Sequence, residues 1–152
     1  MSHSSAQEQV EILIVDDHRL LLNGTISLVG ERFPQAQIRS CQTVQDALTE
    51  VRKHLPDLAI VDLSLPETSR TAANVEQGLG LLKCLMQDYP QLNLMVQSSN
   101  VKALIRIMPE IDNHQGGFTI ADKSLPIDTF LMRMEWAMLG LTHTKDLQTD
   151  VE

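Results

Sequence analysis

The chain has 152 residues, a length that suits one domain with a single core. Its content of 43% hydrophobic and 21% charged residues is typical of a folded globule, and no apolar stretch has the length of a membrane span. The formal net charge of −8 argues against direct nucleic-acid binding, which needs clustered Lys and Arg, and a cytoplasmic location is expected.

Hydrophobic patterning predicts strands that alternate with helices along the chain. Strands are expected at residues 11–16, 36–41, 57–62, 92–96 and 118–121, and helices at about 19–33, 44–55, 78–89, 101–111 and 126–139. In the first helix, Leu20 and Leu21 are expected to be buried, and Thr43 is expected to cap the second helix. This order predicts an α/β fold: a doubly wound, five-stranded parallel sheet of flavodoxin-like order 2-1-3-4-5, with helices on both faces.

The domain is expected to span residues 11–141. Residues 1–10 are polar, lack the apolar segment of a secretory signal and are expected to form a disordered N-terminal tail. Residues 142–152 are also polar and are expected to form a loose C-terminal tail.

Two apolar runs each end in aspartate: the first strand runs into Asp16 and Asp17, and the third ends at Asp62. In a sheet of the expected order these strands are neighbours, so their carboxylates converge. Three close carboxylates need a cation, and oxygen ligands suit Mg²⁺. Asp17 and Asp62 are predicted to be direct ligands, with Asp16 acting through water and the backbone carbonyl of Ser64 as a further ligand.

Two more polar residues follow later strands. Ser98 ends the fourth strand and can supply a hydroxyl, while Lys123 follows the fifth and can supply a fixed positive charge. A carboxylate nucleophile, a metal, a hydroxyl and a lysine together can accept a phosphoryl group, since that chemistry is largely positioning and charge neutralisation.

With these residues in place, the chain resembles the receiver domains of two-component response regulators over about residues 11–141. The segments that carry the resemblance are ILIVDDH at 12–18, DLAIVDLSLP at 57–66, GLGLL at 78–82 and DKS at 122–124. The Asp-Asp-His run with the downstream Gly24 is most similar to the NarL/FixJ-type subgroup.

The resemblance implies a division of roles. It makes Asp62 the phosphoacceptor, supplied by a histidine kinase or phosphotransfer protein, and assigns Asp16 and Asp17 to Mg²⁺, Ser98 to the switch hydroxyl and Lys123 to phosphate contact. It implies a signalling protein that at most phosphorylates and dephosphorylates itself, rather than an enzyme.

Three departures from the family pattern stand out. Residues 67–77 form an insertion beside Asp62, which either covers the pocket as a lid or has no role. Gln97 competes with Ser98 for the switch position. Phe118 lies five residues before Lys123, whereas the family's aromatic residue lies three before, where Ile120 stands.

The last helix carries a second apolar stripe formed by Met132, Trp136 and Leu139, apart from its core stripe. This stripe is either a partner or homodimer surface, since Met and Trp are enriched at interfaces, or a sign that the helix is deeply buried. The residue His18 is expected to lie at the pocket rim or to cap the first helix.

Four functions remain open. The first is a phosphorylation-dependent receiver without a DNA-binding output domain, which acts through a protein contact or a phosphoryl relay. The second is the receiver portion of a longer transcription regulator. The third is a magnesium-dependent phosphatase with Asp62 as nucleophile, although Ser64 stands where that class needs a second carboxylate. The fourth is a phosphorylation-independent receiver-like binding module.

Overall fold

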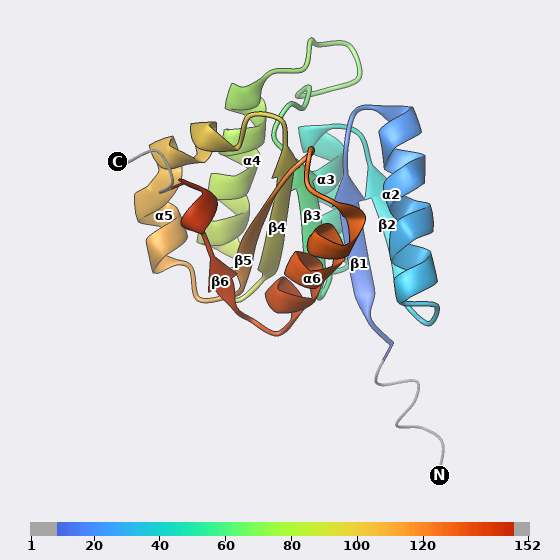
Figure 1. The fold of residues 1–152 in the computed structure, drawn as a ribbon. Coiled ribbons are helices and arrows are strands. Elements are labelled where there is room, and N and C mark those ends of the chain that lie inside the picture. Colours follow the sequence, from blue (N-terminus) through green and yellow to red (C-terminus); the bar gives the residue numbers. More distant parts are fainter. Residues whose placement is uncertain (1–8, 148–152) are drawn as a thin grey trace.

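The structure, a computed structural model, describes residues 9–147 of the chain (Figure 1). The predicted tail at residues 1–10 therefore lies mostly outside the described residues, and so does the predicted tail from residue 148 onward. The described strands are β1 (Glu11–Val15), β2 (Gln37–Cys41), β3 (Leu58–Asp62), β4 (Asn93–Ser98), β5 (Phe118–Asp122) and β6 (Thr142–His143). The α-helices are α2 (Arg19–Arg32), α3 (Val44–Lys53), α4 (Val75–Asp88), α5 (Met108–Asn113) and α6 (Ile127–Met138), and the 3₁₀ helices are η1 (Val101–Ile107) and η2 (Lys145–Leu147).

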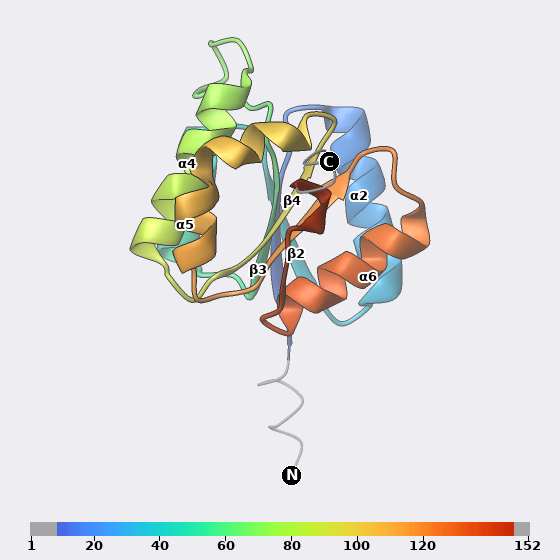
Figure 2. The same cartoon turned by 60° about the vertical axis from the view of Figure 1, so that its left-hand side comes forward.

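The strands form one parallel sheet of order β2-β1-β3-β4-β5-β6, which confirms the predicted order and adds a short sixth strand. Helices α2 and α6 cover one face, and α3, α4 and α5 cover the other (Figures 1 and 2). Within β1 successive buried side chains alternate between the two faces of the sheet, with Ile12 and Ile14 packed on the α2/α6 side and Leu13 and Val15 on the other. This is the period-2 pattern of a strand buried on both faces.

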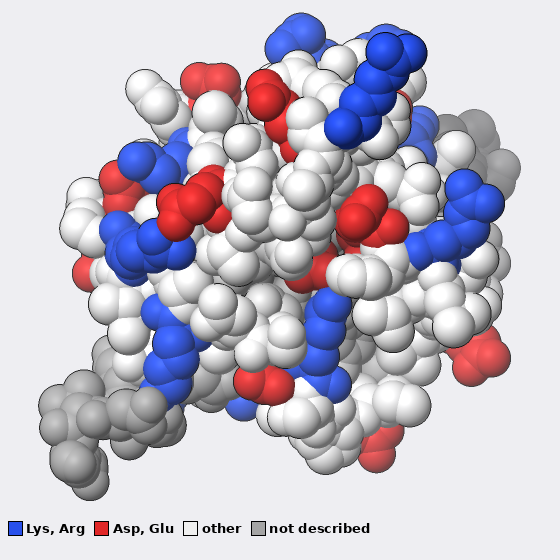
Figure 3. All heavy atoms as spheres, turned by 90° about the horizontal axis from the view of Figure 1, so that it is seen from above, with Lys and Arg blue, Asp and Glu red and all other residues white. Residues whose placement is uncertain are grey.

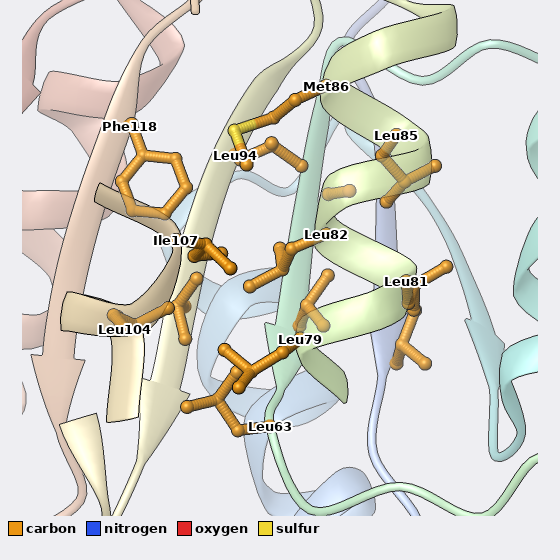
Figure 4. Close-up of a cluster of buried hydrophobic side chains, with 14 of the residues drawn as sticks. Leu63, Leu79, Leu81, Leu82, Leu85, Met86, Leu94, Leu104, Ile107 and Phe118 are labelled. Carbon is orange, nitrogen blue, oxygen red and sulfur yellow. The ribbon is translucent and has the colours of Figure 1, made fainter. Parts of the chain in front are cut away.

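The larger of the two core clusters lies between the sheet and α3, α4 and η1. Leucines of α4 interdigitate there with Leu94 of β4, Leu104 and Ile107 of η1, and Phe118 of β5 (Figure 4). Among the described residues, no helix combines the length and apolar character needed to cross a membrane.

The ends of α3 and α4 are set by side-chain caps. Thr43 caps α3 as predicted, since its hydroxyl accepts a hydrogen bond from the Asp46 N–H at 3.0 Å. Helix α4 starts at Val75 rather than at Gly78, because the Asn74 side chain accepts a hydrogen bond from the Gln77 N–H at 2.9 Å.

The fourth predicted helix is divided in two. Residues Val101–Ile107 form a 3₁₀ helix, and an α-helix begins only at Met108. Pro109 accounts for this, because it has no N–H to donate to the carbonyl of Ile105 and its ring would clash with that carbonyl in an α-helix. The Ile105 carbonyl accepts instead from the Met108 N–H.

The expectation of a loose tail from residue 142 is wrong for residues 142–147. Gly140, with φ of 83°, ends α6 with Leu141 N–H bonded to Trp136 O and Gly140 N–H bonded to Ala137 O, which is a Schellman motif. The chain then turns back, pairs with β5 as β6, and buries Leu147 at 5% exposure in the larger core cluster.

Two leucines predicted to be buried are instead at the surface. Leu20 is 85% and Leu21 49% exposed, whereas Leu22 and Val29 are the buried residues of α2. The helix is apolar on more than one side, so periodicity alone placed the buried face incorrectly.

Candidate functional site

Asp16 and Asp62 lie side by side at the carboxyl ends of β1 and β3. These strands pair in register, with Val15 opposite Val61, so the two residues that follow reach the same edge of the sheet. Both carboxylates are almost fully buried, at 0% and 1% exposure. The expected convergence of acids at this edge therefore holds for these two residues.

Each oxygen of Asp62 has a partner. Oδ2 pairs with the Lys123 Nζ at 2.9 Å, and Oδ1 accepts a hydrogen bond from the Ser64 N–H at 3.2 Å. Lys123 comes from the end of β5, and its backbone N–H is tied to the Ser98 carbonyl at 3.1 Å. The structure thus brings the predicted lysine directly onto the predicted phosphoacceptor.

Asp16 is only half satisfied. Its Oδ1 accepts the His18 N–H at 2.9 Å, while its Oδ2 is buried without a hydrogen-bond partner. Burial raises the pKa of Asp16 above its ordinary value, and the nearby Asp62 carboxylate adds to this, against the lowering effects of the His18 N–H and Lys123. An unpartnered buried carboxylate oxygen is costly unless something positive binds it.

Among residues 9–147, the group that could hold a metal ion consists of Asp16, His18 and Asp62, whose ligand atoms lie within 4.8 Å of one another. His18 is exposed, with its Nδ1 3.5 Å from Asp16 Oδ1 and 3.9 Å from Asp62 Oδ2. It lies at the rim and makes no side-chain cap on α2. The sequence signal for its position was its place directly after two aspartates.

Asp17 lies outside that group, although it was predicted to be a direct ligand. It is half-buried and follows the end of β1, where strand alternation no longer fixes which of two adjacent acids faces the pocket. Its role and that of the Ser64 carbonyl stay predictions. The orphaned Asp16 Oδ2 beside the Asp62 carboxylate nevertheless fits a hard cation with oxygen ligands.

The two candidates for the switch position face opposite sides of the sheet. Gln97 lies two residues after Met95 of the α2/α6 cluster, and Ser98 two residues after Val96 of the other cluster. Gln97 pairs with Asp62 across the sheet and lines a groove with Asp16 and Lys123. Ser98 is buried, and its Oγ accepts the Asn100 N–H at 2.9 Å, immediately before η1.

The aromatic residue of β5 is fixed in the core. Phe118 is fully buried in the cluster shown in Figure 4, and Ile120, at the family's aromatic position, is fully buried too. Phe118 could act as a surface aromatic switch only by leaving the core, and Ile120 is not aromatic.

The insertion at 67–77 begins as a loop and ends as the first turn of α4. An isolated bridge between Leu65 and Asn74 closes its base, and the N–H groups of Val44 and Gln45 bind the Pro66 and Glu67 carbonyls at 3.0 and 3.1 Å. Beyond this base the loop projects past the N-terminal end of α4, away from the body of the domain (Figures 1 and 2). This course gives no support to a lid over Asp62.

The second stripe of the last helix is split. Met132 and Leu139 are exposed at 42% and 75%, whereas Trp136 is half-buried with its ring 5.1 Å from that of His143 in β6. A homodimer or partner surface there stays a prediction, with Trp136 engaged by its own chain.

The carboxyl-end face of the sheet has acidic and basic side chains interspersed (Figure 3). A doubly wound sheet with buried Asp16 and Asp62 and an ion-paired Lys123 at this face defines a CheY-like α/β domain. The chain belongs to the response regulator receiver domain family, whose model matches residues 12–116.

Curated relatives share the same region. The transcriptional activator protein ExaE of Pseudomonas putida is 32% identical over 91 residues, which are 60% of this chain and 39% of that protein. The DNA-binding transcriptional activator DevR/DosR of Mycobacterium tuberculosis is 26% identical over 90 residues, 59% of this chain and 38% of that protein. The chain thus spans about two fifths of the length of these relatives.

Solved structures share the fold. A LuxR-family two-component response regulator from Aurantimonas sp. SI85-9A1 superposes with a TM-score of 0.72 at 18% identity, covering 95% of this chain and 96% of that one. The receiver domain of NtrX from Brucella abortus gives a TM-score of 0.67 at 19% identity, covering 84% of this chain and 98% of that one.

Proposed function

We propose that this protein is a phosphorylation-dependent receiver in a two-component phosphorelay, located in the cytoplasm, that signals through protein–protein contact. Asp62 accepts the phosphoryl group from a histidine kinase or phosphotransfer protein. The observation that carries this proposal is the buried Asp62 carboxylate, held at 2.9 Å from the Lys123 ammonium beside the unpartnered Asp16 Oδ2.

The chemistry follows from these groups. An Asp62 oxygen forms a bond to phosphorus as the P–N bond of the donor phosphohistidine breaks, and the imidazole nitrogen keeps the electron pair. Lys123 neutralises charge that develops on the phosphoryl oxygens. Asp16, Asp17, Asp62 and the Ser64 carbonyl would hold Mg²⁺, which contributes further charge neutralisation when bound.

The test is intact mass spectrometry after incubation with Mg²⁺ and acetyl phosphate. We expect one phosphoryl adduct on the wild type and none on Asp62→Asn. Asp88→Asn is the matched control, because it makes the same chemical change at an exposed position at the end of α4 and should keep the adduct. A wild type that gains no adduct under saturating donor would instead support the phosphorylation-independent binding module.

This chain has a surface beside the pocket to which the donor protein could bind. A groove between α2 and α6 is lined by Asp16 and Lys123 at one end and by apolar side chains along its length. Leu20, Leu21 and Ile127 line this groove together and are 85%, 49% and 58% exposed, and a contiguous apolar patch of this kind marks an interaction site. We propose that the histidine kinase or phosphotransfer protein docks here.

This docking proposal predicts a selective defect. A panel assay first identifies a histidine kinase that phosphorylates the wild type. With that kinase, Leu20→Asp should be phosphorylated at least about tenfold more slowly, since central apolar contacts dominate interfaces. Phosphorylation by acetyl phosphate should be unchanged. Leu55→Asp, at a 56%-exposed leucine near the opposite end of the sheet, is the control and should behave as wild type with both donors. Equal kinase rates for the two variants would argue against the groove.

The relatives suggest one alternative. ExaE and DevR/DosR are named transcriptional activators, and this chain matches 39% and 38% of their lengths. The alternative is that this receiver is a portion of a longer transcription regulator, which a longer reading frame around its gene would establish.

A further inference from the structure

The segment 141–147 covers the open edge of β5. Thr142 and His143 pair with Phe118 and Thr119 as a parallel strand, and the Phe118 N–H donates to the Leu141 carbonyl at 3.0 Å (Figure 1). An uncovered strand edge presents unpaired N–H and C=O groups that can accept a strand from another protein. In this structure the chain fills that edge itself.

Two side-chain contacts hold the segment in place. Leu147 is 5% exposed and belongs to the same core cluster as Leu104 and Ile107 of η1, on which η2 lies (Figure 2). His143 packs its ring against Trp136 of α6 at 5.1 Å between centroids. A two-residue strand with one buried leucine is a small anchor, so the segment belongs among the elements that open most easily.

Helix η1 connects this segment to the phosphorylation pocket. The Ser98 Oγ accepts the N–H of Asn100, the residue that precedes η1, and the Ser98 carbonyl accepts the N–H of Lys123. Phosphorylation of Asp62 changes its ion pair with Lys123. A shift of Lys123 would act through its N–H bond to Ser98 on the bond between Ser98 and Asn100 at the start of η1. A movement of η1 would then act directly on the contacts of Leu147.

The conformation of η1 suits such a movement. It runs for seven residues as a 3₁₀ helix, whereas 3₁₀ runs of more than three or four residues are uncommon and often mark hinges. Pro109 prevents its conversion into a continuous α-helix with α5.

We propose that segment 141–147 is an autoinhibitory strap, which masks the edge of β5 and the adjoining face of η1 and is released when Asp62 is phosphorylated. The proposal rests on the proposed function of Asp62, and it gives the protein an output that does not need a surface aromatic residue. Release exposes the Phe118 N–H and the apolar site of Leu147, which is the surface that a downstream protein would contact.

The chain carries its own probe for this release. Trp136 is the single tryptophan, so the intrinsic emission reports on its contact with His143. Adding Mg²⁺ and acetyl phosphate should change this emission and raise amide exchange of Phe118 and residues 142–147 at least about tenfold. Asp62→Asn should show neither change, and intact mass measures the phosphorylated fraction in the same samples.

Variants test the strap without phosphorylation. Leu147→Asp should produce the same changes in emission and exchange in the absence of phosphodonor, while protection of β1 and β3 stays at the wild-type level. Leu147→Ala should shift both readouts in the same direction by less, and serves if the charged variant fails to fold. Lys145→Ala, at an exposed neighbour in η2, is the control and should leave both readouts unchanged.

The outcomes separate the two proposals. A phosphoryl adduct without a change in emission or exchange, while the Leu147 variants change both, would overturn the strap and leave the function of Asp62 intact. No adduct on the wild type would overturn both. Unchanged exchange in the Leu147 variants would show that this side chain does not hold the strap.

Discussion

Gly78→Ala is expected to lower the free energy of unfolding by about 3 kcal/mol or more, at the upper end of what overpacking costs. A Cβ at residue 78 would lie 1.8 Å from the carbonyl oxygen of Leu63 and 2.5 Å from its carbonyl carbon. Both atoms are backbone, so no side-chain rotation relieves the clash. Urea unfolding followed by circular dichroism measures the effect as a shift in midpoint.

Gly80→Ala is the matched control two residues further along α4. Nothing lies within 4 Å of its added Cβ, and the helix is regular there. Alanine should therefore raise the free energy of unfolding by about 0.5–1 kcal/mol through its better helix propensity. Equal destabilisation by the two substitutions would mean that the close contact with Leu63 is not what Gly78 provides.

The contact of Gly78 also connects stability to function. Leu63 directly follows Asp62, so a displaced Leu63 backbone moves the carboxylate relative to Lys123. Gly78→Ala protein that remains folded at low temperature should therefore also accept phosphate more slowly from acetyl phosphate.

The sheet could be predicted from the sequence because each of its buried strands is a short apolar run between polar breaks. Runs such as 12–15 and 58–61 are apolar at every position, which is typical of strands in a sheet that is covered on both faces. The strand β6 could not be predicted this way, since it consists of only Thr142 and His143 and is held by two tertiary contacts, those of Leu147 in the core and of His143 with Trp136.

Two helix boundaries had usable signals. Asn74 followed by Gln77 has the spacing of a capping box, which indicates a helix start at Val75. Pro109 indicates that a regular α-helix cannot run through residues 105–109. The burial of α2 had no such signal, because leucines exposed at the groove beside α6 cannot be told from core leucines by residue type.

The acidic pocket was predictable as a location but not in its details. Strand ends at Asp16 and Asp62 determine which acids meet, because β1 and β3 are neighbours. The choice between Asp16 and Asp17 as the metal-facing residue depends on the backbone just past the strand, where the period of two no longer applies. Only the three-dimensional structure shows that Asp16 has the buried, unpartnered oxygen.

Asp16→Asn is expected to stabilise the protein in metal-free buffer at neutral pH and to lower its affinity for Mg²⁺ by more than about tenfold. The pKa of Asp16 in the folded state is raised, chiefly by burial. Folding therefore favours the protonated acid, and the stability it contributes is full below the ordinary pKa and is lost as pH rises through the folded-state pKa. Asparagine carries no charge and loses nothing over this range.

Thermal unfolding with and without Mg²⁺ tests both the gain in metal-free stability and the loss of Mg²⁺ affinity. Without metal the variant should melt above the wild type at pH 7, and the difference should vanish below the ordinary pKa of aspartate. With Mg²⁺ at a hundred times its dissociation constant, the wild type should gain about 2.7 kcal/mol and the variant much less. Asp122→Asn is a control of opposite sign, because the N–H and hydroxyl of Ser124 lower the pKa of that carboxyl.

A reversal in the order of stability of the wild type and Asp16→Asn on adding Mg²⁺ would show that the pocket binds the cation. Selection for stability alone would replace a buried, unpartnered carboxylate, since its removal is expected to stabilise the metal-free protein. If the wild type is less stable than Asp16→Asn without Mg²⁺ and more stable with it, the function of Asp16 is to bind the cation. If Mg²⁺ stabilises both proteins equally, the cation binds elsewhere, and Asp17 becomes the acid to replace next.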